Sequence, residues 1–359
     1  MSLNRDFHRL TIAEVRRETA DSVSVRFALP RELYPVFAFR AGQHVTLRAE
    51  IGGEELRRNY SVCAAPHEGE IRIAVKLMPG GRFSSWANAN LAPGQSIDVL
   101  APMGRFVLPR SGTAPWHVAL AGGSGITPVL SIVKTALRDI PDSRFTLLYG
   151  NRDTASIMFL EELEGLKNRY MDRFEVYHFL EFESGEIELF NGRLDRERLE
   201  QVFASLVDVT AADAVFICGP GPMMDAAEQA LLARGVAKEK ILVERFTTGA
   251  VSAEQRARDE LLQKKAAGTQ IVVTLDGRRA RIPFDPAKGN ILESVQAAGL
   301  PAPYACKGGV CSTCRARLVS GQVTMKKNYG LTDQEIADGY VLTCQAVPAS
   351  DEVVLTYDS

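Results

Sequence analysis

Four cysteines near the end of the chain restrict what it can fold into more than any other feature. Cys306, Cys311 and Cys314 have the spacing C-x4-C-x2-C, and Cys344 follows after a longer gap. This is the ligand spacing of a plant-type [2Fe–2S] cluster, in which four thiolates hold two irons. Because three of the ligands stand on one short loop, we expect that loop to wrap closely around the cluster.

The residues between the first two cysteines support this interpretation. Gly308 and Gly309 adopt positive φ angles at little cost and let backbone N–H groups point at sulfur. A structural zinc site is an alternative, but it favours paired C-x2-C units, and only one such unit is present. Disulfide bonds are the other alternative, and they suit secreted chains. The first six residues lack the apolar segment of a secretory signal.

Length, composition and charge limit the classes of protein to which this chain can belong. A chain of 359 residues predicts two to three domains, and 46% hydrophobic with 24% charged residues is typical of a soluble globular protein. The net charge of -2 argues against nucleic acid as the main partner. No apolar run approaches the length of a membrane span. We therefore expect a cytoplasmic protein with neither nucleic acid nor membrane as a partner.

Residues 8–108 contain short β-type runs separated by turn residues, and this pattern predicts a closed antiparallel barrel. Arg58-x-Tyr60-Ser61 stands at the start of one of these runs. An arginine suits a diphosphate, a tyrosine ring stacks on a flat heterocycle, and a serine hydroxyl bonds a ring nitrogen. The alternative is a strand edge whose polar residues are simply solvated.

A second cluster in this region is the glycine-rich stretch Gly80–Ser85. Glycines followed by a serine at a helix start make a phosphate-binding helix N-terminus. The alternative is an ordinary helix cap after a turn.

From Trp116 the pattern changes to buried strands that alternate with helices up to about Arg234, which predicts a doubly wound parallel sheet. Nucleotides bind at the carboxyl ends of such strands. The loop Gly122–Pro128 follows the first strand. It lacks the third glycine of the standard dinucleotide fingerprint and the last glycine of a G-x-S-x-G nucleophile elbow.

Two further positions in this region carry chemical predictions. Arg152 follows the second strand, where a guanidinium favours a 2′-phosphate and hence NADPH over NADH. The alternative is an exposed loop arginine. Cys218 begins a Cys-Gly-Pro segment after a later strand, and it is either part of the nucleotide site or a small buried residue.

The last third begins with a charged stretch, 250–268, that we expect to be a linker with some helix. Asp276-Gly277 stands between two β-type runs and predicts a hairpin. Short strands and one helix, Asn290–Ala298, surround the cysteine loop.

Together, the R-x-Y-S motif, the G-G-x-x-S motif, the A-G-G-S-G-I-T-P loop and the cysteine loop resemble the ferredoxin–NADP reductase superfamily with a C-terminal plant-type ferredoxin domain. The resemblance implies a multidomain β + α/β + α+β chain. Its parts would be a FAD-binding Greek-key barrel over 1–112, a NAD(P)H-binding doubly wound sheet over 113–249, a linker over 250–268, and a β-grasp [2Fe–2S] domain over 269–359.

The resemblance also implies roles for individual residues. Arg58 is expected on the FAD diphosphate, Tyr60 against the isoalloxazine ring, and Ser61 near flavin N5. The other implied residues are Gly81, Arg82, Phe83 and Ser84 near the FAD diphosphate, Gly122, Gly123, Ser124, Gly125 and Thr127 on the NAD(P)H diphosphate, Cys218, Gly219 and Pro220 near the nicotinamide, and Glu244 and Phe246 beside the flavin. Ser61 and Glu244 are the residues expected to tune N5.

The order flavin, nucleotide, ferredoxin resembles the reductases of bacterial multicomponent oxygenases. The stretches Gly53–Arg58, Phe216–Pro220, Pro303–Cys311 and Gly339–Ala346 resemble most the reductase subunits of phenylacetyl-CoA epoxidase complexes. The implied electron path runs from NADPH through FAD and [2Fe–2S] to a di-iron oxygenase of phenylacetate catabolism. The alternatives are the reductase of another oxygenase or hydroxylase, and a non-enzymatic redox sensor.

Overall fold

The computed structural model describes residues 6–109, 114–246 and 253–358. These residues form two compact units, of which one is Asp6–Glu244 and the other begins at Arg245. The domain boundaries expected after residues 112 and 249 lie outside the described ranges. Within those ranges, no helix combines the length and apolar character needed to cross a membrane.

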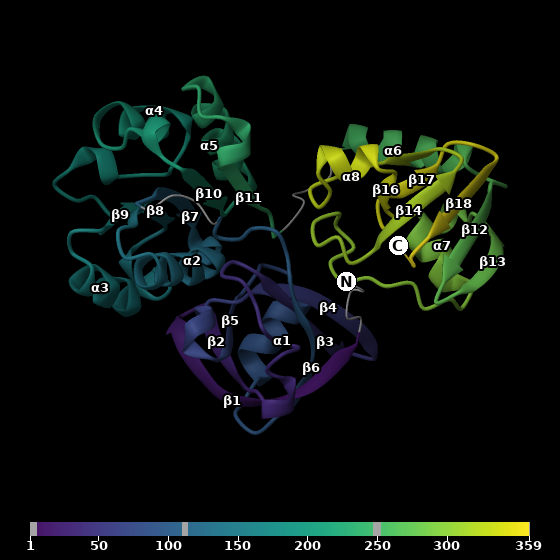
Figure 1. Ribbon diagram of the computed structural model, residues 1–359, viewed down its shortest axis with the longest axis horizontal. Helices are drawn as coiled ribbons and strands as arrows, with labels where there is room; N and C mark the ends of the chain where they lie inside the picture. Colours follow the sequence, from purple (N-terminus) through teal and green to yellow (C-terminus); the bar gives the residue numbers. More distant parts are fainter. Residues whose placement is uncertain (1–5, 110–113, 247–252, 359) are drawn as a thin grey trace. The chain divides into compact units, whose positions relative to one another are not determined.

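The first part of the larger unit is a six-stranded antiparallel sheet (Figure 1) with the strand order β4-β3-β6-β1-β2-β5. Its strands are β1 (Phe7–Thr19), β2 (Ser22–Ala28), β3 (His44–Ile51), β4 (Glu54–Ser61), β5 (Ile71–Lys76) and β6 (Ser96–Met103). A bridge from Val62, directly after β4, to Ile73 of β5 joins the two edge strands. Helix α1 (Arg82–Asn90) packs Phe83 and Ala87 into the barrel core. The closed barrel agrees with the alternating sequence pattern.

The second part of the larger unit is a five-stranded parallel sheet with the order β11-β10-β7-β8-β9. Its strands are β7 (Trp116–Gly122), β8 (Arg144–Asn151), β9 (Phe174–Leu180), β10 (Ala214–Cys218) and β11 (Ile241–Glu244). From β7 the strand order proceeds through β8 to β9 on one side, and β10 and β11 are added on the other side. The strand order therefore reverses between β7 and β10, although all strands are parallel. In doubly wound sheets, ligands bind at this reversal, beyond the carboxyl ends of the strands.

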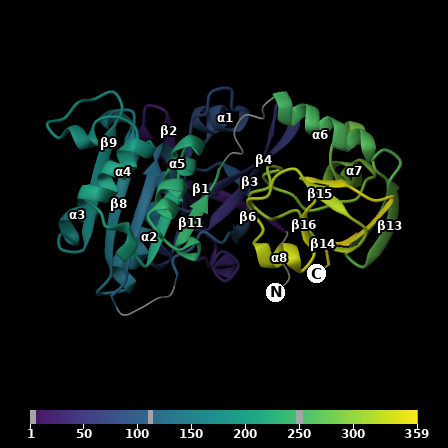
Figure 2. The same ribbon diagram turned by 90° about the horizontal axis from the view of Figure 1, so that it is seen from above.

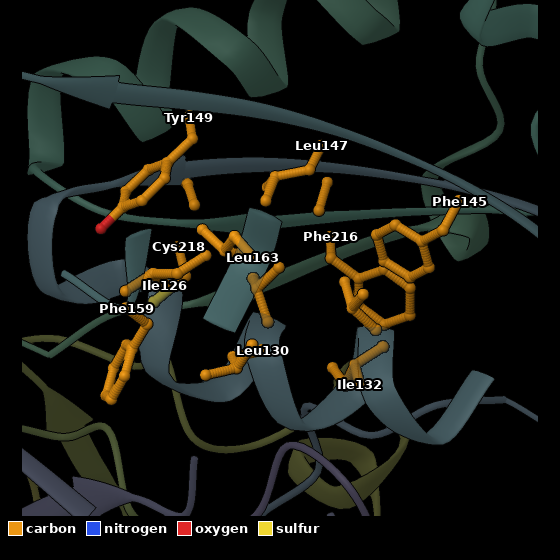
Figure 3. Close-up of a cluster of buried hydrophobic side chains, with 14 of the residues drawn as sticks. Ile126, Leu130, Ile132, Phe145, Leu147, Tyr149, Phe159, Leu163, Phe216 and Cys218 are labelled. Atoms are coloured by element: carbon orange, nitrogen blue, oxygen red, sulfur yellow. The ribbon is translucent and has the colours of Figure 1, made fainter. Parts of the chain in front are cut away.

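Helices cover both faces of the parallel sheet (Figure 1): α2 (Ile126–Asp139) and α3 (Leu160–Arg169) on one face, α4 (Arg196–Ser205) and α5 (Gly221–Ala233) on the other. Figure 3 shows the first of these cores, in which Leu130 and Ile132 of α2 pack with Phe145 and Phe216 of the strands. Because helices cover both faces, the central strands β10, β7 and β8 are buried and almost continuously apolar, as their sequences indicated.

The smaller unit is a β-grasp-like domain built on the sheet β13-β12-β18-β14-β16, with β15 and β17 paired separately. Its elements are α6 (Ala253–Lys265), β12 (Gln270–Leu275), β13 (Arg278–Pro283), α7 (Ile291–Ala297), β14 (Arg315–Ser320), β15 (Val323–Met325), α8 (Asp333–Ala337), β16 (Tyr340–Leu342), β17 (Ala346–Pro348) and β18 (Glu352–Thr356). Asp276 and Gly277 have φ angles of 51° and 73°, so they form the hairpin turn that their sequence predicted.

The stretch expected as a linker is largely structured. Helix α6 occupies most of it (Figure 2). Leu262 and Ala266 pack into the core of the smaller unit together with Ile291 and Leu292 of α7. The charged run is therefore mainly the exposed face of a helix that belongs to this unit. Charge composition indicated an exposed segment but gave no sign of the few apolar contacts that attach it.

Candidate functional site

The R-x-Y-S motif forms the end of β4, on the barrel. Tyr60 is partly buried, and its ring centroid lies 5.8 Å from that of Phe83. Burial raises the pKa of the Tyr60 phenol, although the positive charge of Arg58 opposes this effect. The Arg58 side chain is exposed and donates a hydrogen bond to the carbonyl of Arg57 over 2.7 Å. The motif thus offers a neutral aromatic ring beside an accessible guanidinium.

The G-G-x-x-S motif forms the turn into α1. The Ser84 hydroxyl accepts a hydrogen bond from the Met78 backbone N–H and donates to the Gly81 carbonyl, both over 3.1 Å. A Cβ at Gly81 would stand 2.6 Å from Ser84 Oγ, so this turn requires glycine. The Phe83 side chain is only 1% exposed in the barrel core. A ligand at this turn can therefore reach the backbone of Phe83 but not its ring.

Arg82, the first residue of α1, contacts the turn between β3 and β4. Its guanidinium pairs with Glu54 and donates to the Ile51 carbonyl over 2.9 Å. The side chain is half exposed. In this arrangement the Arg82 charge is directed at the barrel's own acidic turn.

Ser61, Glu244 and His44 meet where the barrel contacts the parallel sheet. The Ser61 hydroxyl donates to Glu244 Oε2 over 3.2 Å, and Glu244 Oε1 lies 3.5 Å from His44 Nδ1. The His44 and Glu244 side chains are 7% and 10% exposed. Glu244 ends β11 and pairs in register with Cys218 of β10. The structure thus brings the two residues expected to tune flavin N5 together, one from the barrel and one from the parallel sheet.

His44 was not predicted from the sequence. It is the first residue of β3, and the antiparallel register places it opposite Ser61. A Cβ at Gly104 would stand 2.9 Å from His44 Nδ1, so the chain directly after β6 approaches the ring closely. Only the strand pairing reveals this neighbour, because nothing in the local sequence around His44 marks it.

The loop after β7 and the Cys-Gly-Pro segment after β10 are in direct contact. A Cβ on Gly125 would stand 2.0 Å from the Cys218 carbonyl oxygen, and one on Gly122 would stand 2.6 Å from Pro220 Cδ. A Cβ on Gly219 would stand 2.9 Å from the Gly122 nitrogen. The glycines therefore allow two loops at the reversal of the sheet to pack backbone against backbone.

Hydrogen bonds fix the shape of the first loop. The Thr127 hydroxyl donates to the Ser124 carbonyl over 3.0 Å, and the Tyr149 hydroxyl donates to the Gly123 carbonyl over 3.0 Å. Gly123 has a φ of 51°. The loop leads directly into α2, and the N-terminus of a long helix attracts phosphate through its free N–H groups and its dipole. This arrangement suits a dinucleotide diphosphate.

Cys218 is completely buried at the end of β10. Burial raises the pKa of its thiol well above the ordinary value, and the negative charge of Glu244 adds to the shift. The residue is thus a neutral thiol at physiological pH.

Arg152 directly follows β8, next to β7 in the sheet. Its Nη2 lies 2.8 Å from Oδ2 of Asp21, which belongs to the turn between β1 and β2 of the barrel. Asp21 Oδ1 lies 3.5 Å from Lys76 Nζ at the end of β5. The sequence marked Arg152 but neither of its two barrel neighbours.

Phe246 belongs to the smaller unit and is 40% exposed there.

The cysteine loop directs hydrogen-bond donors at sulfur. The Gly308 N–H donates to Cys306 Sγ over 3.3 Å, and the Cys306 N–H to Cys311 Sγ over 3.5 Å. The Thr313 hydroxyl also donates to Cys311 Sγ, over 3.2 Å. The pKa of Cys311 is lowered, first by its hydrogen bond with the Cys306 thiol and then by Thr313. Such donors stabilise a thiolate that binds iron.

The four sulfurs form two pairs. The Cys306 thiol interacts with that of Cys311, and the Cys314 thiol interacts with that of Cys344. Among the described residues, no three His, Cys, Asp or Glu side chains form a group that could hold a metal ion. A structural zinc ion needs four ligands around one point, whereas a [2Fe–2S] cluster takes two thiolates at each iron. Two pairs of thiols therefore suit the two irons of such a cluster.

Comparisons with known proteins agree with a chain of three domains. Three family models match the chain: "Oxidoreductase FAD-binding domain" over residues 9–108, "Oxidoreductase NAD-binding domain" over 119–229, and "2Fe-2S iron-sulfur cluster binding domain" over 273–349. A subunit of the 1,2-phenylacetyl-CoA epoxidase of Escherichia coli K12 is 42% identical over 98% of both chains. The chain belongs to the ferredoxin–NADP reductase superfamily, with a C-terminal [2Fe–2S] ferredoxin domain.

Two other similar proteins align with this chain over nearly their whole length. The ferredoxin reductase component of the 3-ketosteroid-9-alpha-monooxygenase of Rhodococcus rhodochrous is 34% identical over 97% of this chain and 96% of its own. The solved structure of phthalate dioxygenase reductase, described as a modular structure for electron transfer from pyridine nucleotides to [2Fe–2S], is 25% identical. It covers 98% of both chains with a TM-score of 0.60. The protein is thus an NAD(P)H-dependent oxidoreductase that transfers electrons.

Proposed function

We propose that this protein is the reductase component of a phenylacetyl-CoA epoxidase of phenylacetate catabolism in the cytoplasm. It would pass electrons from NADPH through FAD and the [2Fe–2S] cluster to a di-iron oxygenase. The observation that carries the proposal is the 42% identity to the 1,2-phenylacetyl-CoA epoxidase component over 98% of both chains. At this identity, with all three domains aligned, the docking surface for the oxygenase is expected to be shared as well.

Each proposed cofactor has a set of residues that would hold it. Arg58, Tyr60 and the backbone of Gly81–Ser84 would hold FAD, because they combine a cation, an aromatic ring and a helix N-terminus. The loop Gly122–Thr127 and the segment Cys218–Pro220 would hold the nucleotide. When bound, FAD accepts a hydride, and the cluster carries one electron at a time.

Ser61 and Glu244 would tune the reactive edge of the flavin. The Glu244 carboxylate accepts the Ser61 hydroxyl hydrogen bond over 3.2 Å and so fixes that hydroxyl in one orientation. His44 Nδ1, 3.5 Å from the other carboxylate oxygen, holds Glu244 from the barrel side. Phe246 is retained as a flavin neighbour on the resemblance alone.

The preference for NADPH is proposed from Arg152. A guanidinium after the strand next to β7 lies where the adenosine ribose of a dinucleotide is expected. Its planar fork suits a phosphate better than a hydroxyl group. The side chain is 55% exposed and thus accessible to a ligand.

A second candidate is the reductase of another oxygenase. The 34% identity to a 3-ketosteroid-9-alpha-monooxygenase component over 97% of the chain favours it. Reconstitution distinguishes the two candidates: the purified protein is mixed with NADPH and either a phenylacetyl-CoA oxygenase or a steroid oxygenase. We expect product only with the former. Product only with the latter would replace the proposal, and slow NADPH oxidation with every artificial acceptor would favour a redox sensor.

A further inference from the structure

The turn between β1 and β2 places one carboxylate among the cations at the nucleotide edge. Asp21 Oδ2 lies 2.8 Å from Arg152 Nη2, and Asp21 Oδ1 lies 3.5 Å from Lys76 Nζ. A Cβ built on Gly123, in the loop proposed to bind the diphosphate, would stand 4.0 Å from Lys76 Nζ. A barrel residue thus connects the arginine proposed to read the 2′-phosphate with a lysine beside the diphosphate loop.

Asp21 is held firmly in this position. The Thr19 hydroxyl donates to Asp21 Oδ1 over 2.8 Å, and Thr19 is itself only 6% exposed. The Leu77 N–H donates to the Asp21 carbonyl over 2.7 Å. Burial raises the pKa of Asp21, but the Thr19 hydrogen bond and the charges of Lys76 and Arg152 outweigh it and leave the pKa lowered. The carboxylate is therefore fixed in place and stays ionised.

Arg152 is accessible but already holds an anion. Its side chain is 55% exposed, whereas those of Asp21 and Lys76 are 24% and 17% exposed. A ribose 2′-phosphate that approached Arg152 would have to replace the Asp21 carboxylate, or remain close to it at a cost from like-charge repulsion. A ribose 2′-hydroxyl carries no charge and does not meet this competition.

We propose that Asp21 is a specificity-determining residue, which competes with the nucleotide 2′-phosphate for Arg152 and thereby reduces the preference for NADPH over NADH. The inference rests on the proposed role of Arg152. It adds that the barrel, and not the nucleotide-binding sheet alone, sets the nucleotide preference. Asp21 touches no reacting atom and acts only through Arg152 and Lys76.

The test measures binding rather than turnover. Calorimetric titration of the full-length protein with 2′,5′-ADP and with 5′-AMP compares two ligands that differ only in the 2′-phosphate. We expect Asp21→Asn to tighten 2′,5′-ADP binding about three- to tenfold, from relief of repulsion and loss of the competing ion pair. The affinity for 5′-AMP should rise less, because this ligand gains only through Lys76 beside the diphosphate loop. In an Arg152→Gln background, Asp21→Asn should give no extra gain for 2′,5′-ADP over 5′-AMP.

Three outcomes overturn the inference. If Arg152→Gln selectively weakens 2′,5′-ADP but Asp21→Asn gives no gain, Arg152 keeps its role and the inference about Asp21 is wrong. If Asp21→Asn tightens both ligands equally, Asp21 does not discriminate. If Arg152→Gln weakens neither ligand selectively, the role of Arg152 and the inference both fail. Asp142→Asn, in the exposed loop before β8, is the control, and Asp21→Ser replaces Asp21→Asn if the latter does not fold.

Discussion

The Ser61 hydroxyl donates a hydrogen bond to Glu244 Oε2 over 3.2 Å, although 183 residues separate the two in the chain. The bond links the last residue of a barrel strand to the last residue of a parallel strand. It is partly buried, and His44 Nδ1 approaches the other oxygen of the same carboxylate. This contact is the point where the two proposed cofactor sites of the larger unit meet.

Replacing Ser61 should slow flavin reduction. Ser61→Ala removes a hydrogen bond to a charged group, worth about 1.5–3 kcal/mol, which corresponds to a rate loss of about 10- to 100-fold if the bond acts in the transition state. Glu244→Gln keeps a neutral acceptor and should cost less. Rapid mixing of the FAD-loaded protein with NADPH, followed at the flavin absorbance, measures this rate. Ser205→Ala, at the exposed end of α4, is the control, and a full rate in Ser61→Ala would remove Ser61 from the site.

Of two glycine substitutions, one should weaken nucleotide binding and the other should stabilise the fold. Gly125→Ala would place a Cβ 2.0 Å from the Cys218 carbonyl oxygen, so it should separate the two nucleotide loops and weaken NADPH binding. Gly165 lies inside α3 with nothing within 4 Å of a built Cβ. Gly165→Ala should therefore raise the free energy of unfolding by about 0.5–1 kcal/mol. Titration with NADPH tests Gly125→Ala, and urea unfolding tests Gly165→Ala. Normal nucleotide binding by Gly125→Ala would contradict the proposed loop contact.

Lys134 should be important for joining the barrel to the parallel sheet. Its Nζ lies 2.7 Å from Glu68 Oε2 of the barrel and 2.7 Å from Glu162 Oε1 of α3, with 6% of the side chain exposed. Lys134→Met leaves partly buried carboxylates without this partner and should lower the free energy of unfolding by about 3 kcal/mol. Arg196→Met breaks the exposed pair with Glu200 and should cost less than about 0.5 kcal/mol. If urea unfolding showed equal losses of unfolding free energy in the two variants, the ion pairs of Lys134 would stabilise the protein no more than an exposed pair does.

Acid should destabilise the protein through His117. The ring is fully buried between Phe145 and Phe216, and neither ring nitrogen has a hydrogen-bond partner among the described residues. Burial lowers the pKa of His117 to about 4 from an ordinary 6.5. Between these pH values the unfolded chain binds a proton and the folded protein does not. Stability should therefore fall by up to about 3 kcal/mol as the pH drops through this window, and it should recover as the pH rises.

The control for this effect is His117→Leu, which has no titrating ring. Its free energy of unfolding should change less between pH 7 and pH 5 than that of the unsubstituted protein. Parallel curves for the two proteins would show that His117 does not cause the acid sensitivity.

Removal of one cluster ligand should remove the cluster. Cys311→Ser should lose iron, acid-labile sulfide and the visible absorption of the cluster while FAD is retained, since the flavin site lies in the larger unit. Cys63→Ala is the matched control, because Cys63 is buried in that unit and its pKa is raised to about 12 by burial. It should keep both iron and flavin. Full iron content in Cys311→Ser would contradict the ligand assignment.

The sequence alone determined the domain types and most of the cluster site. Ligand spacing is local, so Cys306, Cys311 and Cys314 could be recognised without a fold. Strand and helix types follow from side-chain periodicity, and the turn at Asp276-Gly277 follows from the φ angles that these residues tolerate. The glycine loop after Trp116–Ala121 was likewise visible from its place between a buried strand and a helix.

Only the tertiary structure decided which distant residues meet. His44 reaches Glu244 through strand register, and Asp21 reaches Arg152 because a barrel turn lies beside the end of β8. The tertiary structure also showed that Phe83 presents only its backbone at the α1 turn. It showed as well that the charged stretch before β12 is mostly the helix α6. The contacts of His44 with Glu244 and of Asp21 with Arg152 join segments more than a hundred residues apart. No local propensity encodes them, since they depend on how whole elements pack.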